Sequence, residues 1–166
     1  MTNRIYNVLF LSTGNAARSI MAEAILNSGG AGRFRACSAG SRPADAVHPL
    51  ALEQITSFGI SVEGLRPKSW NEFASLEAPH MDFVITICDE AAGEVCPHWP
   101  GQPTTAHWAF QDPAAVKGAD EEVRQAFAKV CREIKTRLDL FRSLPSEKLD
   151  GMALSGELDN MGDARQ

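Results

Sequence analysis

A loop of small residues that ends in an arginine is the stretch of this sequence whose residue types are best suited to bind an anion. The loop spans residues 12–19 and follows four apolar residues, and apolar residues recur at helical spacing after it. A loop that opens a helix turns backbone N–H groups outward, with the positive end of the helix dipole behind them. Arg18 adds a planar, permanently charged group that can bind two oxygens of a tetrahedral oxyanion.

Asp112 is a second candidate for chemistry, because a carboxyl group beside a bound oxyanion can act as a general acid. It precedes Pro113, and this pair taken alone is more typical of a turn. It lies after the last predicted strand and before a long predicted helix.

Cys88 and Cys96 are candidates for a redox pair, with packing as the alternative interpretation. Cys88 follows directly on a predicted buried strand. A zinc site made with His98 and His107 is the weaker interpretation, because seven residues separate the two cysteines where structural zinc sites have two to four.

The elements that must position these residues alternate between strand and helix. Strands are predicted within residues 5–11, 34–38, 82–87 and 104–110. Helices are predicted over residues 18–28, 49–58, 70–76 and 120–141. Ser69 and Glu72 have the spacing of a capping box at the start of the third helix.

This alternation predicts an α/β domain with a four-stranded parallel sheet and helices on both faces. We take the sheet to be that of a flavodoxin-like three-layer sandwich, with the strand order 2-1-3-4. In that order the first and third strands are neighbours. The loop after Ser12 and the residue Cys88 are therefore expected at the same edge of the sheet.

The length and composition indicate one globular domain. We assign residues 1–143 to the domain and residues 144–166 to a C-terminal tail, either packed or disordered. A net charge of -5 argues against nucleic acid and anionic membranes as partners, and no apolar run is long enough to span a membrane. We expect a cytoplasmic protein with reduced thiols, in which Cys37 and Cys131 are packing residues.

Taken together, these motifs resemble the low-molecular-weight protein tyrosine phosphatases and the arsenate reductases that share their fold. Ser12, Arg18 and Ser19 are similar to the family's phosphate loop, Cys-x5-Arg followed by Ser or Thr, with Ser12 at the position of the nucleophilic cysteine. Asp112-Pro113 resembles the loop that carries the general acid. The resemblance implies these oxyanion-binding residues: Thr13, Gly14, Asn15, Ala16, Ala17, Arg18 and Ser19.

The segments around Cys88 and Cys96 resemble arsenate reductases in particular. The resemblance implies that these two cysteines carry oxidising equivalents away from the nucleophile. Phosphatases of this fold usually have tyrosines after Asp-Pro, whereas Ala114 and Ala115 follow here and Tyr6 is the only tyrosine.

The resemblance implies thiol-dependent reduction of arsenate to arsenite, with thioredoxin, glutaredoxin or a low-molecular-weight thiol as reductant. We expect the chain with Ser12 to bind arsenate, phosphate or sulfate without turnover, because a serine hydroxyl needs a nearby base. Ser12 is either an introduced substitution or the mark of a natural pseudo-enzyme that binds or senses oxyanions. A phosphatase for phosphotyrosine or small phosphoesters is the other alternative.

No tightly bound cofactor is expected. Some arsenate reductases of this kind bind potassium near the loop, and Asn15, Glu23 and Ser38 could supply oxygen ligands here. We expect Arg42, Arg66 and Lys68 to be solvated loop charges, and the protein to be a monomer or a weak homodimer. Trp99, Trp108 and Phe110 are expected to form an apolar wall of the site.

Overall fold

The computed structural model describes residues 5–29, 32–87, 99 and 103–155. In this part of the chain the elements are, in order, β1 (Tyr6–Leu11), α1 (Arg18–Gly29), β2 (Phe34–Ala39), α2 (Pro49–Ser57), the 3-10 helix η1 (Trp70–Phe73), β3 (Phe83–Thr86), β4 (Thr104–His107), the 3-10 helix η2 (Pro113–Ala115), α4 (Asp120–Arg142) and α5 (Ser146–Ser155). Their bounds lie close to those predicted for most elements.

The four strands form one parallel sheet in the order β2-β1-β3-β4, as predicted. Leu11, the last residue of β1, lies beside Ala39 of β2 and Thr86 of β3. The central position of β1 follows from its sequence, because a nearly continuous apolar run can be buried on both faces of the sheet.

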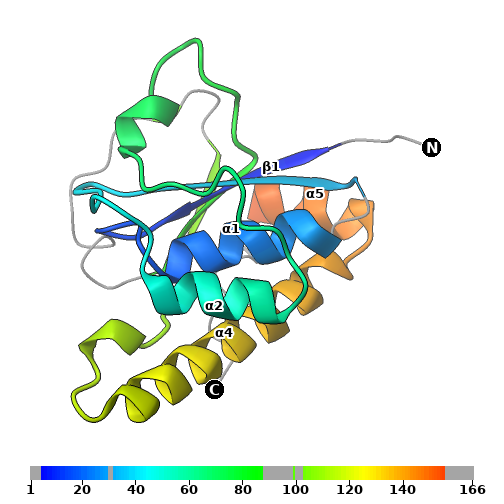
Figure 1. Cartoon of the computed structure of the whole chain (residues 1–166). Helices are drawn as coiled ribbons and strands as arrows, with labels where there is room; N and C mark the ends of the chain where they lie inside the picture. Colours follow the sequence, from blue (N-terminus) through cyan, green and yellow to red (C-terminus); the bar gives the residue numbers. More distant parts are fainter. Residues whose placement is uncertain (1–4, 30–31, 88–98, 100–102, 156–166) are drawn as a thin grey trace.

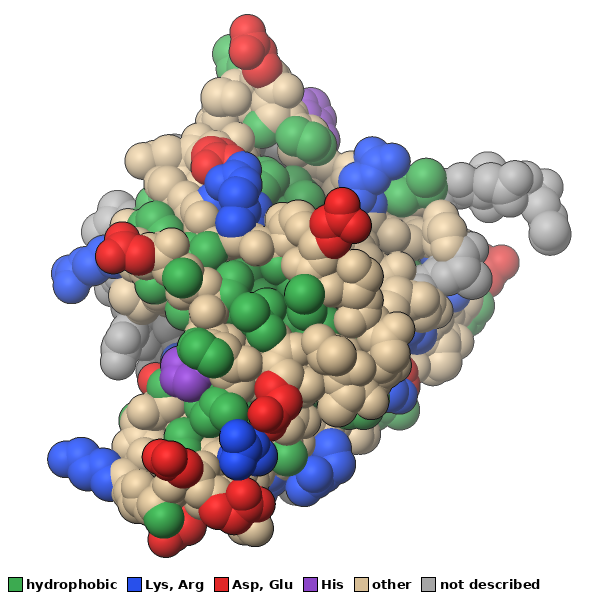
Figure 2. All heavy atoms as spheres, viewed as in Figure 1, with side chains coloured by type: hydrophobic (Ala, Val, Ile, Leu, Met, Phe, Trp, Pro, Cys, Tyr) green, Lys and Arg blue, Asp and Glu red, His purple; other side chains and the backbone are tan. Residues whose placement is uncertain are grey.

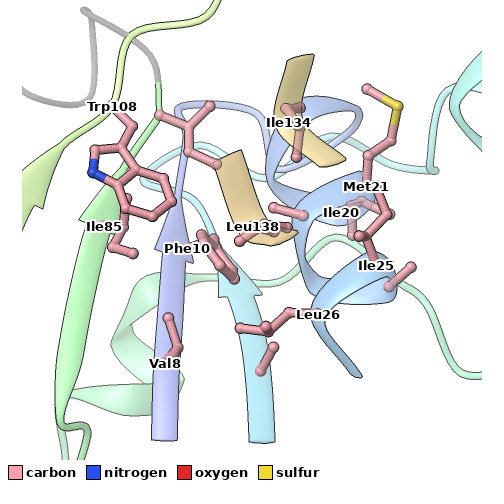
Figure 3. Packing of buried hydrophobic residues seen from close by; sticks show 14 of the residues in the cluster. Val8, Phe10, Ile20, Met21, Ile25, Leu26, Ile85, Trp108, Ile134 and Leu138 are labelled. Atoms are coloured by element: carbon pink, nitrogen blue, oxygen red, sulfur yellow. The ribbon is translucent and has the colours of Figure 1, made fainter. Parts of the chain in front are cut away.

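The main core lies between one face of the sheet and the helices α1, α2 and α4 (Figure 1). Val8 and Phe10 of β1 point into this core, toward Ile20 and Leu26 of α1 and Leu138 of α4 (Figure 3). Alternate residues of β1 point the other way, since successive side chains of a strand face opposite sides.

The second face of the sheet has a smaller core. Leu9 and Leu11 of β1 pack there with Val84 of β3 and with Phe73 of η1. Figure 1 shows η1 on the side of the sheet opposite to α1, α2 and α4. In the described part of the chain, α-helices therefore cover the first face and a 3-10 helix helps to cover the second.

Residues 144–151 pack against the domain. Ser146–Ser155 forms α5, and Leu149 is completely buried in the main core. The Tyr6 hydroxyl donates a hydrogen bond to Asp150 Oδ1 at 3.0 Å, which fastens α5 to the first strand. Of the two forms expected for the tail, residues 146–151 adopt the packed one.

The predicted capping box forms only in part. Ser69 Oγ accepts a hydrogen bond from the Asn71 N–H, as a cap should, but the Glu72 carboxylate binds the Arg66 guanidinium at 3.0 Å. The element it starts is a 3-10 helix of 4 residues, shorter than the helix predicted over residues 70–76.

Acidic and basic side chains are interspersed on the face shown in Figure 2, without a large patch of one sign. Among the helices that the structure describes, none combines the length and the apolar character that crossing a membrane requires.

Candidate functional site

The loop of residues 12–18, which we call the anion loop, leaves the carboxyl end of β1 and runs directly into α1. The Ile87 N–H donates to the Leu11 carbonyl at 2.8 Å, so the chain leaves β3 beside the start of this loop. The predicted meeting of these two strand ends is confirmed as far as Ile87. Cys88, Cys96 and His98 lie outside the described residues.

Three carbonyl groups of the anion loop bind a neighbouring segment of the chain. Those of Thr13, Gly14 and Ala16 accept backbone hydrogen bonds of 2.8 to 2.9 Å from the segment of residues 42–48. In a planar trans peptide the C=O and the following N–H point in opposite directions, so these bonds turn N–H groups inward. The N–H groups of Gly14 and Ala17 have no acceptor within the described residues. They are available to an oxyanion.

Gly40 allows the loop to lie directly against the end of β2. A β-carbon at this position would lie 2.5 Å from the carbonyl oxygens of both Ser12 and Thr13. Backbone atoms cannot yield as a flexible side chain can, so only glycine fits here. Neither Gly40 nor the segment 42–48 was among our predicted site residues.

Asn15 holds the anion loop in shape. It is completely buried, and its backbone lies in the left-handed region with φ 49°, where asparagine is better tolerated than most residues. Its Nδ2 donates to Ser19 Oγ at 2.8 Å and to Ser38 Oγ at 2.9 Å, while its Oδ1 accepts the Lys68 N–H at 2.9 Å. The structure thus gives Asn15 a scaffolding role.

Ser12 lies at the base of the loop, with 4% of its surface exposed. Its Oγ accepts the Asn15 N–H at 3.2 Å and lies 2.7 Å from Ser19 Oγ. No acidic or imidazole side chain of the described residues is hydrogen-bonded to it. Glu23 is reached only through Ser38 and the Asn15 amide, and an amide that donates both its protons cannot relay one.

Arg18 and Asp112 meet beside the loop. Arg18 Nη1 donates to the Phe110 carbonyl at 2.8 Å, and Nη2 lies 3.6 Å from Asp112 Oδ2. Asp112 Oδ1 also accepts the Ala114 N–H at 3.0 Å and caps η2. The turn and the catalytic interpretations of Asp112 are therefore compatible, because different oxygens face the backbone and Arg18.

Lys68 is not the solvated charge that we expected. Its side chain is 10% exposed, its Nζ donates to the Arg66 carbonyl at 2.8 Å and lies 3.7 Å from Glu23 Oε1. The prediction was wrong because the segment carrying Lys68 pairs with Gly40, a contact that no local pattern indicates. For Arg66, which is 59% exposed, the expectation is confirmed.

The two cysteines within the described residues are packing residues, as predicted. Cys131 is buried in α4, and burial raises its pKa to about 11. Burial and the nearby Glu23 also raise the pKa of the half-buried Cys37. Throughout the described part of the chain, no three His, Cys, Asp or Glu side chains group as they would around a metal ion.

Trp108 and Phe110 belong to the main core, where Arg137 lies over both rings, so the expectation that their side chains line the site is wrong. The ring of Trp99 packs against Trp70 at the second face. Phe110 still serves the site through its carbonyl group, which holds Arg18.

The first strand of this parallel α/β sheet ends in a loop lined with N–H groups, and an arginine follows at the start of a helix. A loop of this kind in such a fold is suited to bind tetrahedral oxyanions. Residues 7–150 match the family described as low molecular weight phosphotyrosine protein phosphatase, and the chain belongs to this family of enzymes.

Curated relatives are named arsenate reductase. The protein of Halalkalibacterium halodurans is 34% identical over 134 residues, which cover 81% of this chain and 93% of the relative. That of Bacillus subtilis is 33% identical over 141 residues, covering 85% of this chain and 96% of the relative.

Two solved structures extend the likeness to the fold. An arsenate reductase in its oxidized state has a TM-score of 0.67 at 26% identity, covering 84% of this chain and 98% of its own. The low molecular weight protein tyrosine phosphatase of T. tengcongensis has a TM-score of 0.67 at 23% identity, with coverage of 84% and 99%.

Proposed function

We propose that this chain is an arsenate reductase in its architecture, and that with Ser12 it binds arsenate or a similar oxyanion without reducing it. The observation that carries the proposal is the anion loop. Hydrogen bonds from residues 42–48 turn its carbonyls outward, and Arg18 stands beside Asp112 at its end. The relatives named arsenate reductase favour arsenate as the oxyanion.

In a form with cysteine at position 12, the helix start and Arg18 would favour the thiolate, which is the attacking species. The thiolate attacks the arsenic atom, and one oxygen takes a proton that Asp112 can donate and leaves as water. Arg18 and the cap of η2 position the Asp112 carboxyl group at the edge of the loop.

The reduction itself then transfers two electrons from sulfur to arsenic. The Cys88 thiolate attacks the sulfur at position 12, a disulfide forms between them, and the sulfur–arsenic bonding pair stays with arsenic, which leaves as arsenite. Cys96 next attacks Cys88 and frees the thiolate at position 12. An external dithiol or low-molecular-weight thiol reduces the Cys88–Cys96 disulfide. The roles of both cysteines rest on the family resemblance.

Ser12 would stop this cycle at its first step. A hydroxyl group ionises far less readily than a thiol and needs an adjacent base, and no base contacts Ser12 among the described residues. The anion loop keeps its shape with serine at this position, because Ser12 Oγ accepts the Asn15 N–H and the Asn15 side chain and Gly40 hold the rest of the loop. Binding without turnover is the expected result, as in an oxyanion-binding or regulatory protein.

The test compares the chain as it stands with Ser12→Cys, with Ser57→Cys as the matched control because Ser57 is exposed at the end of α2. Each protein is assayed for arsenite formation with thioredoxin, glutaredoxin and glutathione, and for hydrolysis of a phosphoester. We expect arsenite only from Ser12→Cys, and none from the double variant Ser12→Cys with Cys88→Ser.

Binding is measured separately, by titrating arsenate and phosphate into the native chain and into Arg18→Ala. We expect binding by the native chain and a large loss in the variant. Turnover by the native chain would refute the role given to Ser12. Phosphoester hydrolysis without arsenite formation by Ser12→Cys would favour the phosphatase alternative. Failure of the native chain to bind either oxyanion would overturn the proposal as a whole.

A further inference from the structure

The network behind the anion loop already engages the oxygen atoms expected to bind the potassium ion that the family resemblance implied. Of the three expected ligands, Asn15 Oδ1 accepts the Lys68 N–H, Ser38 Oγ donates to Glu23 Oε1 at 2.6 Å, and Glu23 Oε1 also faces Lys68 Nζ. A second cation beside Glu23 would meet an ammonium group of the same charge. The residues present therefore do not fit a bound potassium ion.

We propose that the ammonium group of Lys68 is itself the resident cation of this network and makes the anion loop independent of potassium. The ammonium faces Glu23, Glu23 accepts from Ser38, and Ser38 accepts from Asn15. Lys68 is thus a positioning residue, whose ammonium group acts on Asn15 of the anion loop through two side chains, Glu23 and Ser38. The consequence for anion affinity rests on the proposed function, whereas the consequence for stability does not.

Burial makes the Lys68–Glu23 pair matter more than an exposed ion pair would. Their side chains are 10% and 14% exposed, and loss of one partner would leave the other charge poorly solvated and unpaired. A surface pair contributes little by comparison, because water and salt screen it. Both charges also act on one neighbour: besides its burial, Glu23 raises and Lys68 lowers the pKa of Cys37.

Hydrogen bonds of the Lys68 backbone hold the residue that carries the ammonium group in place. The Lys68 N–H donates to Asn15 Oδ1, and the Lys68 carbonyl accepts the Gly40 N–H at 2.9 Å. The Arg66 carbonyl accepts from Lys68 Nζ at 2.8 Å. An ammonium held in this way by two oxygen groups is a substitute for a monovalent cation that needs no binding equilibrium.

The test separates charge from shape at position 68. Lys68→Ala removes the charge and opens space, so that the oxygens of Glu23, Ser38 and Arg66 can take up a potassium ion in its place. Lys68→Met removes the charge but keeps a side chain of similar length in that space. Lys117→Ala is the matched control, because Lys117 is exposed. Melting temperatures are measured without any oxyanion in potassium, sodium or choline chloride.

We expect the native chain and Lys117→Ala to melt at the same temperature in all three salts. Both Lys68 variants should melt about 5 °C lower in choline chloride, and Lys68→Ala should regain about 3 °C in about 0.2 M potassium chloride. Lys68→Met should regain nothing, because its side chain fills the space. In potassium-free buffer, arsenate affinity should fall about tenfold in Lys68→Ala and recover when potassium is added.

A melting temperature of the native chain that rises specifically with potassium would overturn the proposal, and this arm does not depend on any variant folding. Equal responses of Lys68→Ala and Lys68→Met to potassium would also overturn it. Because the melting experiments contain no oxyanion, they stand even if the native chain proves not to bind arsenate. In that case the proposed function fails and the role of Lys68 is judged by stability alone.

Discussion

Replacing Asn15 with alanine removes the side chain that ties the anion loop to the rest of the domain. The Asn15 amide donates to Ser19 and Ser38, and its oxygen accepts the Lys68 N–H. All of these groups lie in the interior behind the loop. The change therefore leaves polar groups without partners, and it also places alanine in a left-handed backbone conformation with φ 49°.

The expected loss of stability is the sum of two contributions, the lost hydrogen bonds and the backbone strain. Each of the three hydrogen bonds contributes about 1 kcal/mol to folding. A β-carbon in the left-handed region costs about 1 kcal/mol for alanine, a cost that glycine avoids. We therefore expect the free energy of unfolding to fall by about 4 kcal/mol in Asn15→Ala and by about 3 kcal/mol in Asn15→Gly.

The assay is urea unfolding followed by tryptophan fluorescence, for which the chain provides 3 tryptophans. The matched control is Asn71→Ala, because Asn71 is exposed and its change should stay within about 0.5 kcal/mol. Arsenate titration of the folded variants provides a second measurement, in which both Asn15 variants should bind more weakly than the control.

Two results would refute this reasoning. If Asn15→Ala unfolds within about 0.5 kcal/mol of the native chain, the side-chain network does not hold the loop. If Asn15→Gly is less stable than Asn15→Ala, the left-handed conformation is not the source of the difference between them.

Two further predictions concern Gly40 and Cys131. Gly40→Ala should lower stability by about 2 kcal/mol and abolish arsenate binding, because its β-carbon would meet two backbone oxygens. The control Gly151→Ala should do neither, because there is open space around Gly151. Urea unfolding and arsenate titration compare the two variants, and equal effects would contradict the close-packing argument. Burial raises the pKa of Cys131 from 9.0 to about 11. The unfolded chain therefore ionises first as the pH rises, and about 2 to 3 kcal/mol of stability present below pH 9 should be lost by pH 11. Urea unfolding across this range should show a shallower decline for Cys131→Ala, and parallel declines would contradict the assignment.

Much of the fold could be predicted because its determinants are local. The apolar runs of β1 and β3 mark buried strands, and the apolar face of α4 marks a helix of 23 residues, Asp120–Arg142. The predicted strand order is that of flavodoxin-like sheets, and the structure has the same order, β2-β1-β3-β4. The neighbouring ends of β1 and β3 could also be predicted, because these strands are adjacent in that order, whereas the contact between Arg18 and Asp112 was not predicted.

Lys68 shows what the sequence does not reveal. A lysine in a loop with Pro67 and no apolar pattern is normally solvated, and only the pairing of this segment with Gly40 places it beside Glu23. The outer layer of the anion loop was missed for the same reason. Arg42 and His48 donate backbone hydrogen bonds to it, and backbone contacts of this kind leave no trace in residue type.

The sequence alone determined the chemical groups at the site: an arginine at a helix start, an aspartate before a proline, an asparagine able to adopt a left-handed conformation, and a serine where its family resemblance implies a cysteine. The tertiary structure decided how they are held. It turned the loop carbonyls outward, kept titratable side chains of the described residues off Ser12, and buried Lys68 against Glu23. Side-chain chemistry is a property of single residues, whereas the arrangement of these groups depends on contacts between segments far apart in the chain.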